Sequence, residues 1–291
     1  MALIAWSLPP RAWRKAALAT SALGEAEHCR PAYRRFLARK YSEAELEDIS
    51  IRRRAYAREL KFQILGLKGP WRRVSRPTCR IEGDEHLGEA LARGRGVILW
   101  VTECAFSTLI VKMALHDAGY QACQLSRPNH GFSSSCFGIR HLNPLWTDVE
   151  DRFIAERILI KGQTAAEAMA VLRERLAANR IVIITVGWQA HKFAEVPFLE
   201  DRLQFPTAPI RLARTTGAAL LPVFTLANAD GSFDVSIGKP LHKCGDDVSD
   251  AQVAAAYAKR LEPFVLDHPD QWKGWPWLMG DQGWGPAKRE L

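Results

Sequence analysis

The pattern of apolar and polar positions changes near residue 96 and divides the chain into two regions. Residues 12–75 have helical periodicity throughout, with a capping signal at residues 42–45, and Pro77 ends the run. From residue 96 onward, short apolar runs alternate with amphipathic segments, a pattern typical of a sheet with helices on its faces. The pattern predicts an α/β fold: a central, mostly parallel sheet flanked by helices, with an N-terminal helical layer.

The second region predicts a series of strands and helices in alternation. The expected strands are residues 96–102, 120–125, 180–186, 218–227 and 232–237. The expected helices are residues 106–119, 164–178, 209–217 and 248–268. Because no linker or repeat interrupts the series, we expect a single domain over residues 1–291, with a helical layer at 1–76 and an α/β core at 77–291.

Composition excludes several classes of protein. The chain has 291 residues, of which 47% are hydrophobic and 25% charged, so it is neither disordered nor a disulfide scaffold. Its six cysteines form no C-x-x-C pair, which favours reduced thiols and no metal site. No apolar run approaches the roughly 18–20 residues of a membrane-spanning helix, and no secretory signal is evident. We expect a cytoplasmic protein.

The basic charge is concentrated in residues 52–76. This segment holds nine lysines and arginines against one acid, Glu59, and its excess equals the net charge of +8 of the whole chain. Apolar residues interleave with the cations, as in an amphipathic helix at an anionic surface. Lipid, an acidic carrier protein and nucleic acid are the candidate surfaces, and nucleic acid ranks last because no nucleic-acid-binding motif is present. The alternative is a solvated helix face whose charges only aid solubility.

The first clear strand ends in a group of polar side chains. No phosphate-binding loop, dinucleotide-binding turn or nucleophile elbow occurs, which disfavours kinases, dehydrogenases and the usual serine hydrolases. The carboxyl end of a buried strand is where α/β proteins place their ligands, and there the chain carries Glu103, Ser107 and Thr108. Glu103 is interpreted either as a general base with a raised pKa or as a helix N-cap.

A second polar cluster, residues 126–141, predicts a loop at the same edge of the sheet. An arginine there, Arg127 or Arg140, could stabilise an oxyanion or bind phosphate, and a histidine, His130 or His141, could act as a base. Ordinary loop polarity is the alternative for each histidine. A nucleophilic Cys136 is disfavoured because such a thiol needs an adjacent base.

Several sequence blocks follow one another in a characteristic order. They are GVILWVT at 96–102, the pair Arg127-Pro128, the segment Gly138-Ile139-Arg140, Val196-Pro197-Phe198 followed by Thr207, RLARTTGAALLPVF at 211–224 and HPDQWKGWPWL at 268–278. Together they resemble the lysophospholipid-acyltransferase-like superfamily, specifically its lipid A biosynthesis lauroyl/myristoyl acyltransferase branch. The resemblance covers roughly residues 40–280.

The resemblance implies acyl transfer from an acyl-carrier-protein or coenzyme A thioester to a hydroxyl or amine. No cofactor is implied beyond this acyl donor as co-substrate. The family's H-x-x-x-x-[DE] motif supplies a general base and the acid that orients it, and in this chain Glu103 and Thr108 stand at those positions. The arginine that stabilises the thioester oxyanion or binds an acceptor phosphate corresponds to Arg140.

Two hypotheses follow. In the first, the chain is an acyltransferase whose lost base is replaced, with catalytic candidates Glu103, Arg140, Thr108 and His130 and substrate-binding candidates Ser107, Arg127, His141 and Thr207. Its partners are acyl carrier protein or acyl-coenzyme A, with peripheral contact to the inner face of the cytoplasmic membrane through residues 52–76. In the second, the fold has lost catalysis and binds a lipid, acyl carrier protein or a partner enzyme.

Overall fold

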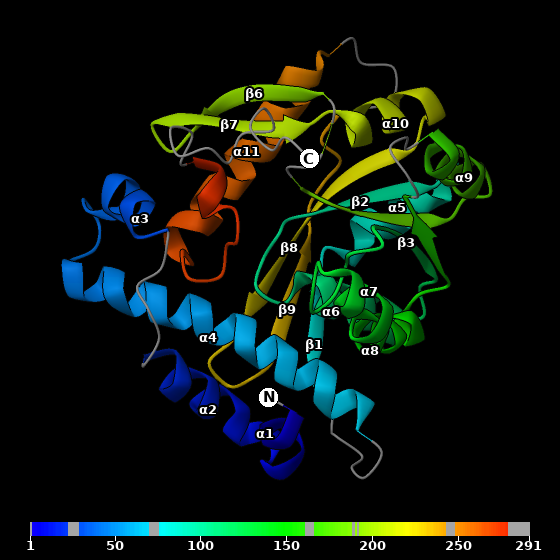
Figure 1. Cartoon of the computed structure of the whole chain (residues 1–291). Coiled ribbons are helices and arrows are strands. Elements are labelled where there is room, and N and C mark those ends of the chain that lie inside the picture. Colours follow the sequence, from blue (N-terminus) through cyan, green and yellow to red (C-terminus); the bar gives the residue numbers. More distant parts are fainter. Residues whose placement is uncertain are drawn as a thin grey trace.

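A seven-stranded sheet forms the centre of the fold in the computed structural model, which describes residues 2–22, 29–69, 76–160, 166–187, 190, 192–242 and 248–278. The strands, in sheet order, are β1 (Cys79–Glu82), β9 (Phe233–Ile237), β8 (Ala219–Ala227), β2 (Val97–Val101), β5 (Ile181–Thr185), β3 (Ala122–Ser126) and β4 (Glu156–Leu159). All neighbours pair in parallel except β8 and β9, which are antiparallel. The mostly parallel sheet is confirmed (Figure 1).

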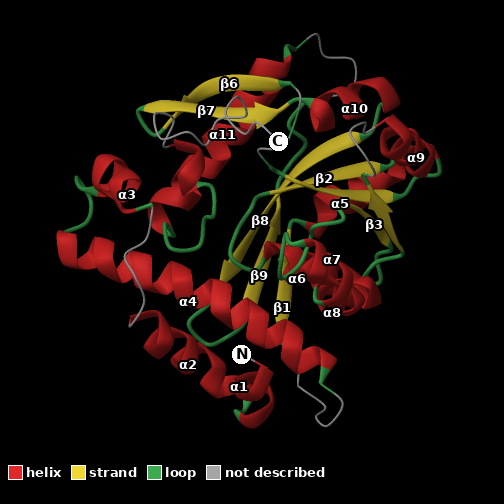
Figure 2. Ribbon diagram, in the orientation of Figure 1, coloured by secondary structure: helices red, strands yellow, loops and turns green. Residues whose placement is uncertain are grey.

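Helices cover both faces of this sheet (Figure 2). Those of the core are α5 (Asp84–Ala92), α6 (Ser107–Asp117), α7 (Cys136–His141), α8 (Asn143–Glu150), α9 (Ala166–Ala177), α10 (Ala208–Thr216) and α11 (Asp250–Asp267), with short 3₁₀ turns at Asp151–Phe153 and Trp275–Leu278. A separate antiparallel hairpin, β6 (Phe193–Phe198) and β7 (Asp201–Pro206), packs on α11. The mixed α/β class is therefore confirmed.

Strand β2 contributes side chains to the hydrophobic cores on both faces of the sheet, which explains its uninterrupted apolar sequence. All five of its residues are buried, and successive side chains of a strand point to opposite faces. Ile98 and Trp100 join the core that contains α9, α11 and the hairpin, whereas Leu99 and Val101 join the core that contains α6. The carboxyl end of β2 is therefore anchored on both sides.

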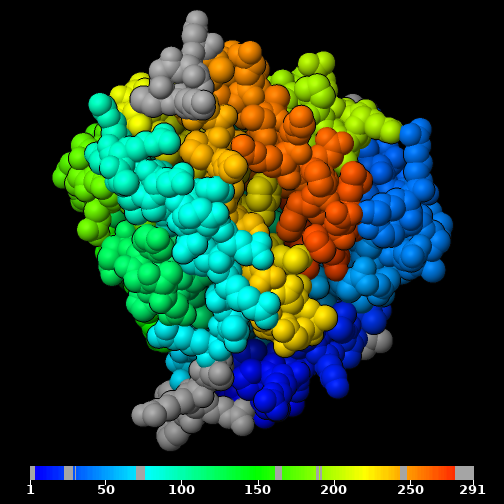
Figure 3. Space-filling view, turned by 180° about the vertical axis from the view of Figure 1, so that it is seen from behind, coloured from blue at the N-terminus to red at the C-terminus, as the bar shows by residue number. Residues whose placement is uncertain are grey.

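The N-terminal helices are α1 (Ala2–Ser7), α2 (Pro10–Ala22), α3 (Arg30–Leu37) and α4 (Glu43–Lys68). The expected capping signal is confirmed, because Ser42 and Glu45 form a reciprocal capping box at the start of α4. Viewed from behind, α11 and the chain after it lie beside these helices (Figure 3), where Lys40 and Tyr41 both donate to the carbonyl of Leu266.

Two predictions of local structure need correction. Residues 12–75 are not one continuous helical run: α2, α3 and α4 are separate helices, and residues 70–75 lie outside the described part. The predicted loop 126–141 ends in the short helix α7, which begins where Ser135 accepts a hydrogen bond from the amide of Gly138. The described helices include none that is both long and apolar enough to cross a membrane.

Candidate functional site

The chain turns sharply after β2, and hydrogen bonds brace the turn. Ser107 donates from Oγ to the carbonyl of Cys104 at 3.1 Å and accepts from the amide of Cys104 at 3.3 Å. The hydroxyls of Thr102 and Tyr257 are hydrogen-bonded to each other below the turn. Ser107 is buried and occupied within the turn, so it acts as a structural brace.

The chain after α11, residues 268–278, is paired with this turn; we call it the tail. Cys104 and Trp272 form an antiparallel bridge, the amide of Ala105 donates to the carbonyl of Gln271 at 2.8 Å, and the amide of Lys273 donates to the carbonyl of Glu103 at 2.9 Å. This pairing places the side chains of Glu103 and Lys273 in neighbouring positions.

Helix α4 holds the tail from the other side. The Arg53 guanidinium donates to the carbonyls of Trp272 and Lys273 at 3.4 and 3.5 Å. One residue earlier, Arg52 donates to the carboxylate of Asp270 at 2.8 Å. Three segments distant in sequence, α4, the β2 turn and the tail, therefore meet at the carboxyl edge of the sheet.

The carboxyl group of Glu103 lies among cations at this edge. Burial raises its pKa, and the positive charges of Lys273, Arg53 and His130 partly offset that rise. Burial also lowers the pKa of Lys273, and it lowers the pKa of Arg53 to about 10. A carboxyl group with a raised pKa is suited to accept a proton near neutral pH. The N-cap interpretation of Glu103 is wrong, because Phe106 occupies the cap position of α6.

His130 belongs to a second set of charged side chains next to Glu103. Its Nε2 lies 2.9 Å from the Oε2 of Glu150, which is completely buried at the end of α8. The same carboxylate binds Lys112 of α6 at 2.7 Å and Arg157 of β4 at 2.9 Å. A protonated His130 lowers the pKa of Glu103 and Glu150 raises that of Lys273, so the two sets influence each other electrostatically.

The remaining predicted site residues lie elsewhere. Arg127 is exposed on the loop, and Arg140 and His141 are exposed on α7. The His141 ring packs against Phe137, with 4.8 Å between the ring centroids. Thr108 lies in the first turn of α6, and its buried Oγ1 makes no hydrogen bond within the described residues. Thr207, at the start of α10, donates to the carbonyl of Lys192 at 3.4 Å. The structure thus brings together Glu103 and His130 of the predicted set.

Sequence reasoning missed Arg53, Lys273, Glu150, Lys112 and Arg157. Their sequence signal is weak, because Arg53 is one of nine cations in the basic segment and Lys273 lies within the tryptophan-rich tail. Several arginines of residues 52–76 face inward: Arg54 donates to the carbonyl of Ser21 at 3.2 Å, and Arg58 donates to its hydroxyl at 3.1 Å. Arg54 and Arg58 therefore stabilise the packing of α4 on α2 and do not form part of an exposed cationic surface.

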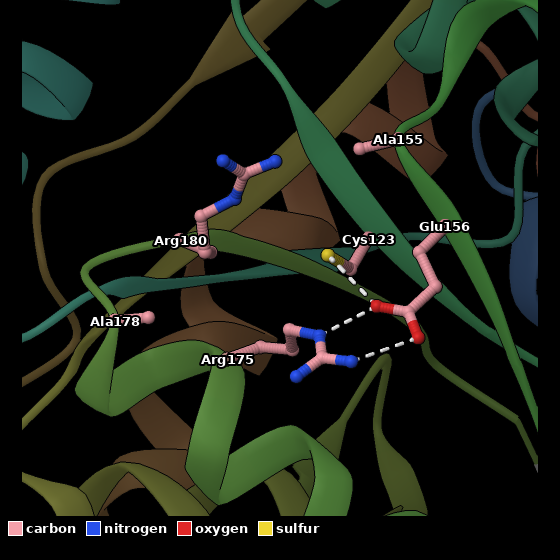
Figure 4. A pocket seen from close by; sticks show the side chains of 6 residues that line it. All are labelled: Cys123, Ala155, Glu156, Arg175, Ala178 and Arg180. Carbon is pink, nitrogen blue, oxygen red and sulfur yellow. Dashed lines mark hydrogen bonds and ion pairs between the residues drawn. The ribbon is translucent and has the colours of Figure 1, made fainter.

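A hollow of about 360 Å³ lies at the opposite end of the strands (Figure 4). Its lining includes Cys123 near the start of β3 and Glu156 at the start of β4. Glu156 is bound by Arg175 at 2.6 and 3.1 Å, while Cys123 points toward the same carboxylate. This hollow is at the amino edge of the sheet, away from Glu103.

Comparison with known proteins gives one family match. A search among curated proteins finds no match. The family model for bacterial lipid A biosynthesis acyltransferases matches residues 67–279, a region that includes Glu103, His130, Glu150 and Lys273. The match spans well over half of the chain, although Arg52 and Arg53 precede it. The chain therefore belongs to the bacterial lipid A biosynthesis acyltransferase family and is an acyltransferase.

Proposed function

We propose that this acyltransferase moves a fatty acyl group from an acyl-carrier-protein or coenzyme A thioester to an amine or hydroxyl acceptor. The reaction would occur at the carboxyl edge of β2. The observation that carries this proposal is the carboxyl group of Glu103, held at that edge among Arg53, Lys273 and His130. Ligands of α/β proteins bind at this end of the strands.

The proposed site differs from the family pattern in its proton acceptor. By their places after the strand GVILWVT, Glu103 would stand where that pattern has histidine and Thr108 where it has an acid. A threonine hydroxyl carries no negative charge and cannot orient an imidazole as a carboxylate does. The base must therefore be supplied by Glu103 itself or by a neighbour such as His130.

An amine acceptor is compatible with such a site. A neutral amine attacks a thioester without a strong base, and positioning of the reactants contributes about 7–11 kcal/mol to lowering the barrier. A hydroxyl acceptor depends more on the base, whose contribution is typically about 10²–10⁴-fold. Cations near Glu103 would stabilise the oxyanion that forms on the thioester carbonyl, and Arg140, which is exposed on α7, would bind a phosphate of the acceptor.

The acyl donor is the partner that this reaction requires, and we propose no other cofactor. Residues 52–76 would bring the protein to the inner face of the cytoplasmic membrane, where the acceptor or donor is presented. Arg52, Arg53, Arg54 and Arg58 contact other parts of the fold, and Lys68 and Arg76 pair with Asp148 and Asp117. Such binding would therefore depend on the remaining cations of the segment.

A non-catalytic binder is the second candidate function. It is favoured by the lack of a histidine at position 103 and of an acid at position 108, and by the cations that already balance the charge of Glu103. Such a protein would hold an acyl carrier protein or lipid without transferring the acyl group.

Intact-mass spectrometry separates the two functions. The purified chain is mixed with acyl carrier protein that bears acyl groups of several lengths and with a pool of amine and hydroxyl acceptors. Acceptor-dependent loss of the thioester, reduced in Glu103→Gln but not in Glu156→Gln, supports the transferase. Glu156 is the matched control because it is a carboxylate paired with arginine at the opposite edge of the sheet. A stable complex without deacylation would support the binder instead.

A further inference from the structure

His130 and Glu150 form an imidazole–carboxylate pair beside Glu103. Nε2 of the ring lies 2.9 Å from Oε2, with the His130 side chain 25% exposed and that of Glu150 fully buried. The ring also packs edge-on against Trp146 at 5.9 Å between ring centroids. The imidazole is therefore fixed on its inner side and open on its outer side.

Glu150 is held as an anion. Burial alone would raise the pKa of its carboxyl group, but Lys112, His130 and Arg157 outweigh burial and hold the pKa well below its usual range. The indole Nε1 of Trp146 donates to Oε1 at 2.8 Å, so both carboxylate oxygens accept hydrogen bonds. An ionised carboxylate can only accept hydrogen bonds, so the Nε2 that faces Glu150 must carry the proton when His130 is neutral.

The second ring nitrogen is left available. Nδ1 of His130 makes no hydrogen bond within the residues that the structure describes, and it belongs to a partly exposed side chain. With the proton on Nε2, Nδ1 carries the lone pair that can accept a proton from a substrate. An ionised carboxylate on one nitrogen and a free lone pair on the other is the arrangement of an oriented general base.

The pair lies at the same edge of the sheet as Glu103. His130 follows β3 and Glu103 follows β2, and both strands run parallel to β5 between them. In its protonated form His130 contributes to lowering the pKa of Glu103. The loop that carries His130 and the turn that carries Glu103 therefore leave the sheet at the same edge, where the proposed transfer occurs.

We propose that His130 is the general base of the acyl transfer and that Glu150 is the residue that positions it. The histidine–carboxylate pair missing at Glu103 and Thr108 is thus supplied by the loop after β3 and by α8. This inference rests on the proposed function and specifies its proton acceptor.

The chemical step balances with the residues named. Nδ1 of His130 takes the proton of the acceptor hydroxyl or amine as its oxygen or nitrogen forms a bond to the thioester carbonyl carbon. The carbon–sulfur bond then breaks, and the departing thiolate takes the proton from the imidazolium. The products are an ester or amide and a free thiol, and His130 returns to its neutral form.

The groups facing the pair would stabilise the imidazolium that forms in this step. Glu150 of α8 and Glu103 after β2 are acidic neighbours, whereas Lys112 of α6 and Arg157 of β4 balance the charge of Glu150. Glu103 then contributes as a counter-charge, so that Glu103→Gln slows the reaction less than loss of the imidazole does.

Replacement of the base tests the first half of the proposal. His130→Gln retains an amide donor for Glu150, and His116→Gln is the control, because His116 also lies beside an acid, Asp117 at 3.3 Å, but at the other end of α6. We expect kcat/KM to fall about 10²–10⁴-fold in His130→Gln and to stay unchanged in His116→Gln. Added imidazole should restore part of the activity of His130→Gly and none to Glu103→Gln.

The role of Glu150 is tested through the pH profile. Glu150→Gln alone leaves the buried charge of Lys112 without its partner, so the double variant Lys112→Met/Glu150→Gln is compared with it, and circular dichroism confirms folding. Loss of the carboxylate disfavours the imidazolium, so the acidic limb of kcat/KM should move to lower pH as turnover falls. A folded double variant with an unchanged limb and turnover would overturn the positioning role.

The outcomes separate this inference from the proposed function. If the wild-type chain transfers acyl groups and His130→Gln does so equally well, His130 is not the base, while the proposed function stands. If Glu103→Gln alone abolishes transfer, Glu103 is the base. If the wild-type chain gives no turnover with any donor and acceptor, both are overturned.

Discussion

The amide of Lys273 donates a 2.9 Å hydrogen bond to the carbonyl of Glu103, joining the tail to the turn that follows β2. Arg53 of α4 binds the carbonyl of the same lysine at 3.5 Å. Because the family match begins at residue 67, Arg53 contributes to the site from outside the matched region. The environment of Glu103 is thus a product of tertiary contacts between distant segments, and its chemistry depends on the stability of those contacts.

Asp270→Asn should loosen the tail. Asp270 has a side chain only 11% exposed and accepts from Arg52 at 2.8 Å, so loss of its charge weakens the attachment to α4. We expect the free energy of unfolding to fall by about 1.5 kcal/mol, the lower end for hydrogen bonds to charged groups because Arg52 itself is partly exposed. Urea denaturation provides the measurement.

Asp267→Asn is the matched control for this prediction. Asp267 binds Lys40 at 2.8 Å, but its side chain is 64% exposed. Solvent screens such a pair, so its loss should leave the urea midpoint unchanged. Equal effects of the two substitutions would show that the Arg52–Asp270 pair does not anchor the tail.

Gly66→Ala should separate α4 from α2. A Cβ at Gly66 would lie 2.3 Å from Cη2 of Trp13, a ring that is buried between the two helices. Overpacking of this kind costs about 1–3 kcal/mol of stability. Gly88→Ala in α5 meets no atom within 4 Å and should instead stabilise the fold by about 0.5–1 kcal/mol. Thermal unfolding of the two variants should therefore shift in opposite directions.

Acid should destabilise the fold through Glu150. The folded-state pKa of this carboxyl lies below the ordinary value of 4.5, so its stabilising contribution is complete above that value and is lost as the pH falls below it. One proton taken up on unfolding gives a slope of about 1.4 kcal/mol per pH unit. Urea titrations at a series of pH values give the free energy of unfolding as a function of pH. Below pH 4.5 its slope should be smaller for Lys112→Met/Glu150→Gln than for the wild-type chain.

Cys136 should react first with an alkylating reagent under native conditions. It is exposed at the start of α7, whereas burial raises the pKa of the Cys104 thiol to about 12. Among the cysteines that the structure describes, Cys29 and Cys79 also have thiol pKa values raised by burial to about 12. Peptide mapping after brief treatment with iodoacetamide should find Cys136 labelled ahead of these three, and preferential labelling of Cys104 would contradict the packing of the turn.

The sequence predicted those strands that are buried on both faces. The runs in β2 and β5 are apolar at nearly every position, because each strand packs against a core on either side. Edge strands β1 and β4 escaped prediction, since each has only four residues, two of them charged, and neither holds a long apolar run. The hairpin of β6 and β7 also escaped, because Pro197 and Pro206 break the usual strand pattern.

The site was predictable only where one segment carries the signal. Glu103 follows a buried strand directly, so its place at the sheet edge could be inferred from β2 alone. The partners of an acid in the folded protein depend on long-range packing, and the sequence therefore indicated neither Lys273 beside Glu103 nor Glu150 beside His130. The sequence also does not predict where each arginine side chain of α4 points. A charge count over residues 52–76 does not distinguish Arg53, which faces the tail, from a cation that faces solvent.

Thr108→Val should stabilise the protein. The Oγ1 of Thr108 is buried and makes no hydrogen bond within the described residues, and an unpaired buried hydroxyl costs about 1–3 kcal/mol. Replacing the hydroxyl with a methyl group removes that cost with little change of shape, so the free energy of unfolding should rise by about 1 kcal/mol. Thr108→Ser is the control, because it keeps the hydroxyl and removes the methyl group, and it should lower stability. A loss of stability in Thr108→Val as large as that in Thr108→Ser would mean that the hydroxyl is satisfied in solution, as by a bound water at this turn of α6.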